Sequence, residues 1–96
     1  MNKYNVIWSP TANTDLNNIY TYIAYNLKET YIANKIVKKI LNSISVLTYF
    51  PERYPKCFYY INKSKNIRKL SINKFIIIYE IDNISRESLY FTHISF

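Results

Sequence analysis

Two side chains in the sequence could take part in phosphoryl or acid–base chemistry: Arg68 and His93. A guanidinium can stabilise the extra charge of a pentacovalent phosphate through paired hydrogen bonds, which is the role considered for Arg68. His93 is the only histidine, and the pKa range of imidazole suits it to move a proton when a ribose 2′-hydroxyl attacks a phosphate. Each residue also has a plainer interpretation, Arg68 as an exposed strand-end cation and His93 as a packed residue with one hydrogen bond. The residues by themselves leave both alternatives open.

Lysines and one tyrosine provide candidate binding residues around this pair. Ammonium groups attract the phosphates of nucleic acid with a salt-dependent strength, and an exposed aromatic ring can stack on a splayed base. For any one of them the alternative is ordinary: a solvated lysine in a basic loop, or one of eleven tyrosines, most of which must be structural. The candidates for binding nucleic acid or another target are Lys56, Lys63, Lys65, Lys69, Lys74 and Tyr90.

Composition limits the classes of function. The chain has 96 residues, enough for one domain spanning 1–96. Its formal net charge of +7 favours nucleic acid, an anionic membrane or an acidic protein as partner. Glycine is absent, which excludes the glycine-rich loops that cradle phosphates, and one histidine with one cysteine excludes the usual zinc spacings. We therefore expect neither a cofactor nor a metal.

Cysteine usage and hydropathy indicate the compartment. Cys57 is the only cysteine, so no disulfide can form within the chain, which fits a reducing environment. No stretch approaches the roughly 20 apolar residues of a membrane span, and the first residues lack the apolar segment of a secretory signal. We expect a cytoplasmic protein.

Two amphipathic helices are predicted in the first half of the chain. Ser9 can cap the first amides of a helix, and Pro10 is tolerated at the first helical position. A helix over 10–27 follows, and a second apolar series at helical spacing runs over 33–47. The apolar residues are Ala12, Leu16, Ile19, Ile23 and Leu27, then Ala33, Ile36, Val37, Ile40, Ile44 and Leu47. The polar side of the second helix is interpreted as solvated, with an acidic partner as the alternative, and carries Lys35, Lys38 and Lys39.

Four strands are predicted around these helices, at 4–8, in a hairpin over 67–81 and at 89–96. The second arm of the hairpin, from Phe75, is almost wholly β-branched or aromatic, which favours the centre of a sheet. The arms are joined through Ser71, Asn73 and Lys74. Strict alternation in the last strand places Leu89, Phe91, His93 and Ser95 on one face and Tyr90, Thr92, Ile94 and Phe96 on the other. The order β-α-α-β-β-β predicts an α+β fold, with an N-terminal strand and an αα-hairpin packed on a mainly antiparallel twisted sheet.

Three stretches, taken in order, resemble the RelE/ParE superfamily of type II toxin–antitoxin toxins: WSPTANTDLNNIYTYI, LTYFPERYP and IRKLSINKFIIIYEID. The resemblance covers nearly the whole chain and implies a compact toxin that an acidic antitoxin neutralises. It also implies one of two targets: RelE-like members cleave mRNA on the ribosome, and ParE-like members poison DNA gyrase.

The resemblance bears on the roles of two residues. Arg68 matches the arginine that helps hold the scissile phosphate in RelE-like members, and His93 falls where relatives often carry an arginine. Many relatives continue past the last strand with a basic or aromatic ending that contributes to the nuclease site, whereas this sequence ends at Phe96 and has no cation after Arg86. This departure favours the ParE-like alternative.

Three hypotheses follow, in order of preference. The first is a growth-inhibiting, ParE-like toxin that binds a protein target such as DNA gyrase. The second is a RelE-like, metal-independent endoribonuclease in which Arg68 stabilises the phosphate, His93 transfers a proton and loop lysines track the mRNA. The third is an attenuated, non-toxic basic binding module.

Overall fold

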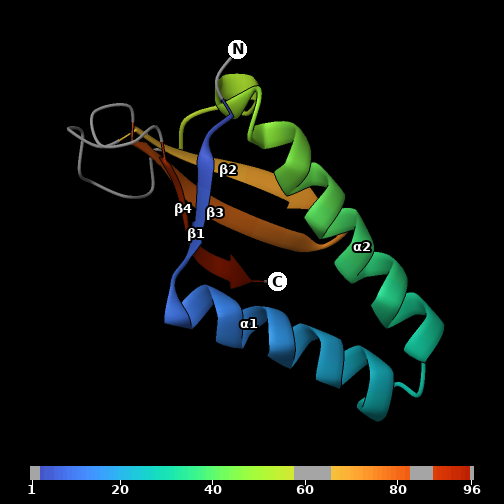
Figure 1. Ribbon diagram of the computed structural model, residues 1–96. Coiled ribbons are helices and arrows are strands. Elements are labelled where there is room, and N and C mark those ends of the chain that lie inside the picture. Colours follow the sequence, from blue (N-terminus) through green and yellow to red (C-terminus); the bar gives the residue numbers. More distant parts are fainter. Residues whose placement is uncertain (1–2, 58–65, 83–87, 96) are drawn as a thin grey trace.

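The computed structural model describes residues 3–57, 66–82 and 88–95, which form one α+β unit (Figure 1). The element order confirms the predicted β-α-α-β-β-β arrangement. The elements are β1 (Asn5–Trp8), α1 (Pro10–Thr21), a π-helical turn η1 (Tyr22–Asn26), α2 (Thr30–Leu47), a 3₁₀ turn η2 (Pro51–Arg53), β2 (Asn66–Ile72), β3 (Phe75–Asp82) and β4 (Ser88–Ser95).

The four strands form one mixed sheet in the order β1-β4-β3-β2. β1 runs parallel to β4, and the other two pairings are antiparallel, so the sheet is mainly antiparallel as predicted. β3 lies inside the sheet, as its apolar sequence indicated, and Ile77, Ile78 and Tyr79 are all buried. The turn before it needs only Asn73 and Lys74, because Asn73 adopts φ 54, a conformation that asparagine tolerates. Ser71 belongs to β2 rather than to the turn.

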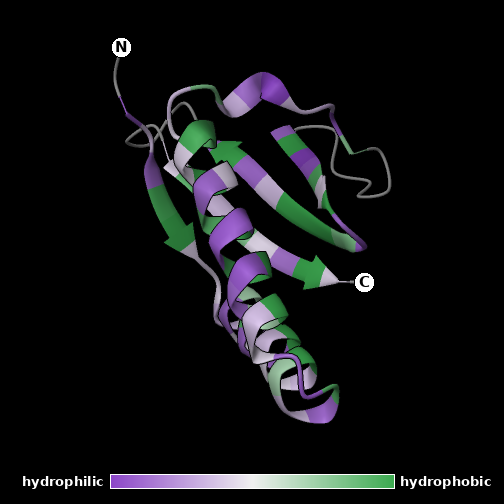
Figure 2. Ribbon diagram, turned by 90° about the vertical axis from the view of Figure 1, so that its right-hand side faces the viewer, coloured by the Kyte–Doolittle hydropathy of each residue, from purple (hydrophilic) through white to green (hydrophobic). Residues whose placement is uncertain are grey.

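Both helices cover one face of the sheet and shield its apolar side chains (Figures 1 and 2). Ser9 caps α1 as predicted, because its Oγ accepts the amide of Ala12 at 2.9 Å. The apolar series of α2 faces the sheet, while its outer residues are hydrophilic over much of its length (Figure 2). The core formed in this way includes Ile19, Ile40, Leu47, Leu70, Ile77, Leu89 and Phe91.

The end of the first helix differs from the prediction. The α-helix stops at Thr21, and Tyr22–Asn26 continue it as a π-helical turn in which the amide of Leu27 bonds to the carbonyl of Tyr22 at 3.1 Å. A π turn contains more residues than an α turn, so the side chains after it rotate relative to the apolar stripe. The expectation that Leu27 extends the buried stripe is therefore wrong, since this side chain is 51% exposed.

The last strand contains a β-bulge that changes which side chains share a face. Ile78 pairs with His93, but the next residue, Tyr79, pairs with Phe91, so Thr92 is the extra residue. Phe91 and Ile94 are consequently both buried, whereas His93 is exposed. The prediction that Leu89, Phe91, His93 and Ser95 share one face is wrong: Leu89, Phe91 and Ile94 pack under the helices, and His93 and Ser95 point to the other side. Phe96 lies outside the described residues.

Candidate functional site

Arg68 lies on the helix-covered face, at the edge of the sheet. Its cross-strand partner is Tyr79, which in turn pairs with the buried Phe91, and such partners project from the same face of a sheet. Its Nη1 donates to the carbonyl of Glu52 at 3.1 Å and to that of Tyr54 at 2.6 Å. Nε donates to Oδ1 of Asn66 at 3.1 Å. The guanidinium therefore fastens β2 to the turn that follows α2.

Tyr79 completes this attachment from inside the core. Its hydroxyl is buried and donates to the carbonyl of Pro51 at 2.8 Å. Burial of the hydroxyl raises the pKa of Tyr79 to about 12, an effect that the nearby Arg68 partly opposes. The phenol is therefore neutral throughout the physiological range, and it acts here as a hydrogen-bond donor to the backbone.

The raised pKa predicts how Tyr79→Phe changes stability with pH. Near pH 7 the variant loses the bond to Pro51 and should be less stable by about 1–2 kcal/mol. The folded wild type holds the phenol proton up to about pH 12, whereas the unfolded chain releases it near pH 10.0, so wild-type stability falls between these values. A difference of two pKa units corresponds to at most about 2.7 kcal/mol, so the stability deficit of Tyr79→Phe should shrink and disappear as the pH rises from 10 to 12. Urea unfolding of both proteins, followed by circular dichroism across this range, measures the difference.

Tyr25→Phe provides the matched control for this prediction, because Tyr25 is 70% exposed and its phenol already faces solvent. Its free energy of unfolding at neutral pH should lie within about 0.5 kcal/mol of the wild type. If Tyr79→Phe lowers the free energy of unfolding by the same amount at neutral and at alkaline pH, the raised pKa of Tyr79 is contradicted.

His93 belongs to the opposite face of the sheet. Register places Lys69, Ile78 and His93 side by side across β2, β3 and β4. They line a cavity of about 420 Å³, which Thr11, Asp15, Cys57, Ile76, Ile94 and Ser95 complete. Asp15 accepts the amide of Ile94 at 3.0 Å and so ties α1 to this end of β4. The cavity combines an imidazole, an ammonium and a carboxylate over an apolar floor.

The two residues proposed for catalysis are therefore not brought together. Arg68 and Lys69 are consecutive in β2, and consecutive strand residues point to opposite faces. Arg68 lies on the face that the helices cover, while Lys69 lies on the opposite face and lines the same cavity as His93. A joint action of Arg68 and His93 on one phosphate is not supported by this arrangement.

The remaining candidate residues are dispersed. Lys56 forms an isolated β-bridge with Arg68 along the outer edge of β2. Lys74 is exposed in the β2–β3 turn, and Tyr90 is half-buried in β4 opposite Glu80. Lys63 and Lys65 lie outside the described residues.

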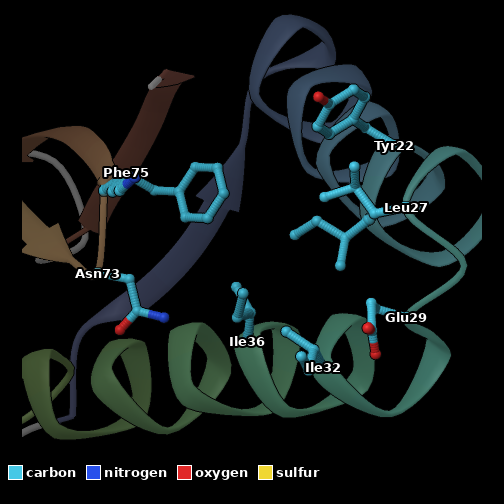
Figure 3. A pocket seen from close by; sticks show the side chains of 9 residues that line it. Tyr22, Leu27, Glu29, Ile32, Ile36, Asn73 and Phe75 are labelled. Carbon is cyan, nitrogen blue, oxygen red and sulfur yellow. The ribbon is translucent and has the colours of Figure 1, made fainter.

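A second cavity, which the sequence interpretation missed, opens between the helical hairpin and the β2–β3 turn (Figure 3). We call it the hairpin groove; its volume is about 470 Å³ and its walls are almost entirely apolar. Its lining comes from η1, from the first turns of α2 and from the start of β3: Tyr22, Ile23, Leu27, Glu29, Ile32, Ile36, Asn73, Lys74 and Phe75. One feature of the sequence could have indicated this groove. Tyr22 and Ile32 are apolar residues near the helix junction that belong to neither predicted apolar stripe, so they were left without a place in the core.

The part of the chain that the structure describes contains neither a metal-binding cluster nor a membrane-spanning helix. No group of three or more histidine, cysteine, aspartate or glutamate side chains is placed to hold a metal ion within 3–57, 66–82 and 88–95. Among the same residues, no helix has the length and apolar character needed to cross a bilayer.

Comparison with known proteins identifies the family. Residues 6–89 match the model of the ParE toxin of type II toxin–antitoxin systems, parDE. Nine chains of solved structures also match, among them a chain of the chromosomal ParDE TA system from P. aeruginosa. That chain superimposes with a TM-score of 0.74 over 97% of this protein and 95% of its own length, at 17% identity, and so shares its fold. No curated protein matches. Because the family model spans most of the sequence, this protein belongs to the ParE family, the toxins of type II toxin–antitoxin systems.

Proposed function

We propose that this ParE-family toxin arrests growth in the cytoplasm by binding a protein target, DNA gyrase, and that an acidic antitoxin neutralises it. The observation that carries the choice against RNA cleavage is the placement of Arg68. RNA cleavage needs a cation on the scissile phosphate and an acid–base group within hydrogen-bond reach of the same reacting atoms. Here the guanidinium bonds to the carbonyls of Glu52 and Tyr54, and the imidazole of His93 belongs to the other face.

Charge supports an acidic antitoxin. The protein carries a formal net charge of +7, and Lys35 and Lys38 are exposed on the outer side of α2. A positive surface of this kind speeds association with an acidic protein and disfavours association with a basic one. The affinity for the antitoxin should therefore weaken as salt is raised.

One observation favours the alternative, RNA cleavage. Lys69 and His93 line the same cavity, so a cation and an imidazole do face one space without Arg68. A nuclease built on this pair would lose activity when either is replaced. The experiment below is designed to distinguish the two mechanisms.

Induced expression followed by two assays tests the proposal. The wild-type protein should stop growth, with gyrase-linked DNA breaks accumulating and with transcripts intact by primer extension. Purified protein should inhibit supercoiling by gyrase. His93→Gln, which keeps a polar side chain but removes the neutral-pH acid–base group, should still arrest growth. Transcripts cut within codons, together with loss of arrest in His93→Gln, would establish the nuclease instead; unimpaired growth under strong expression would support a non-toxic module.

A further inference from the structure

The outer side of α2 carries a straight line of polar side chains, which we call the outer stripe. Its members follow one another at steps of three or four residues, so they lie along one side of the helix. All of them are exposed, while the apolar residues of α2 face the core. Figure 2 shows this hydrophilic side of the helix turned away from the sheet. The outer stripe consists of Tyr31, Lys35, Lys38, Asn42 and Ser45.

The positive charge of the outer stripe is not balanced within its helix. Lys35 precedes Lys38 by three residues and Lys39 by four, and α2 contains no aspartate or glutamate. Like charges at these spacings destabilise a helix by roughly 0.2–0.5 kcal/mol per pair. Lys39 donates to Oδ1 of Asn73 at 3.2 Å, which is a neutral partner and leaves the charge in place. The fold gains nothing from this concentration of cations, whereas a polyanion would neutralise it.

We propose that the outer stripe of α2 binds the phosphates of duplex DNA, and that this binding is separate from recognition of the protein target. The ammonium groups of Lys35 and Lys38 contact the phosphates. The hydroxyl and amide groups of the other three stripe residues can donate to phosphate oxygens beside them. These contacts carry no sequence information, so the binding has no sequence preference.

The shape of the outer stripe fits a DNA groove. From Tyr31 to Ser45 the helix rises by about 21 Å, at 1.5 Å per residue. The major groove of B-DNA is about 12 Å wide and admits an α-helix. The deep and narrow major groove of duplex RNA does not admit side chains in this way. A straight, exposed and polar helix side therefore favours DNA over RNA.

The composition of α2 also distinguishes DNA from other anionic partners. A helix that lies on an anionic membrane inserts its apolar side into the bilayer, but the apolar side of α2 is used in the core, with Ile40 and Leu47 both 0% exposed. The centre of a protein interface is poor in lysine, whereas the middle of the outer stripe is Lys35 and Lys38. An acidic protein gains from the net charge of +7 wherever it binds, so charge alone does not direct it to this stripe.

The test uses the purified full-length protein and a fluorescently labelled DNA duplex of about 20 base pairs, with binding followed by anisotropy from about 50 to 200 mM KCl. Lys35→Gln/Lys38→Gln should weaken binding about tenfold or more at the lowest salt. It should also reduce the slope of log affinity against log salt by about 2, because each lost phosphate contact removes about one unit. Glutamine forms helices about as well as lysine, and circular dichroism verifies that α2 is retained.

Lys56→Gln/Lys74→Gln is the matched control. It removes the same charge from two exposed positions outside α2, both of which the sequence alone had suggested for binding nucleic acid. Its affinity should stay within about threefold of the wild type, with an unchanged salt slope. Equal losses in the two double variants would show that net charge, and not the outer stripe, attracts DNA, and would overturn the proposal.

Two competitors test the class of partner. Duplex RNA of the same sequence and polyglutamate of equal charge should each displace the labelled DNA several-fold less well than unlabelled DNA does. Equal displacement by either competitor, or no measurable binding of DNA at the lowest salt, would also overturn the proposal. Inhibition of gyrase is assayed separately, so a failed protein target and a failed DNA-binding stripe give different results.

Discussion

Replacing Phe91 with alanine should lower the free energy of unfolding by about 3–5 kcal/mol. Phe91 is 0% exposed, and its ring stacks on Trp8 with centroids 5.2 Å apart and on Tyr79 at 5.5 Å. It thereby joins β1, β4 and β3, and its loss leaves a cavity that three strands border. A domain of this size typically has only about 5–15 kcal/mol of stability, so the variant should be partly unfolded at 37 °C.

Urea unfolding followed by circular dichroism measures this loss. Ser95→Ala is the control in the same strand, because Ser95 is exposed and its replacement should change stability by less than about 0.5 kcal/mol. Similar losses in the two variants would mean that β4 does not place Phe91 in the core as described.

Arg68→Ala should cost about 2–4 kcal/mol, because it removes charge-assisted hydrogen bonds to the carbonyls of Glu52 and Tyr54 and to the side chain of Asn66. The carbonyl of Tyr54 is partly buried, and its lost donor can be replaced only in part by water. We expect the melting temperature to fall by roughly 10 °C or more, since 1 kcal/mol corresponds to about 4–8 °C for a domain of this length. Thermal unfolding followed by circular dichroism measures the shift.

Lys74→Ala provides the control for Arg68→Ala, since it also removes one cation but from an exposed turn position. Its melting temperature should stay near that of the wild type. An Arg68→Ala protein that melts like the wild type would show that the three hydrogen bonds contribute little to stability.

The stability prediction changes how a loss of toxicity in Arg68→Ala should be interpreted. A variant that is partly unfolded in the cell loses activity whether or not the residue touches a target. Growth assays of Arg68 variants are therefore informative only beside a measured melting temperature. Replacements at His93, which is exposed, avoid this difficulty.

The sequence by itself determined the order and type of the elements. Ser9 and Pro10 specify the start of α1 through cap chemistry, the spacing from Ala33 to Leu47 specifies the buried side of α2, and the apolar run from Phe75 specifies a strand inside the sheet. Each of these signals is contained within one element, so a single sequence is enough to reveal it. The resemblance to the toxin superfamily could also be recognised from the sequence. Its motifs are short stretches within single elements or adjacent ones, and they occur in a fixed order along the chain.

The tertiary structure decided which side chains meet. The bulge at Thr92 moves His93 to the exposed face, and it depends on the register between β3 and β4 rather than on the sequence of β4. The partners of Arg68 at Glu52 and Tyr54 are 16 and 14 residues away, so no local pattern indicates that its guanidinium is already engaged. The hairpin groove likewise exists only because the π-helical turn, α2 and the β2–β3 turn converge. Periodicity assigns each residue to a side of its own element, but strand register and helix packing determine what lies opposite that side.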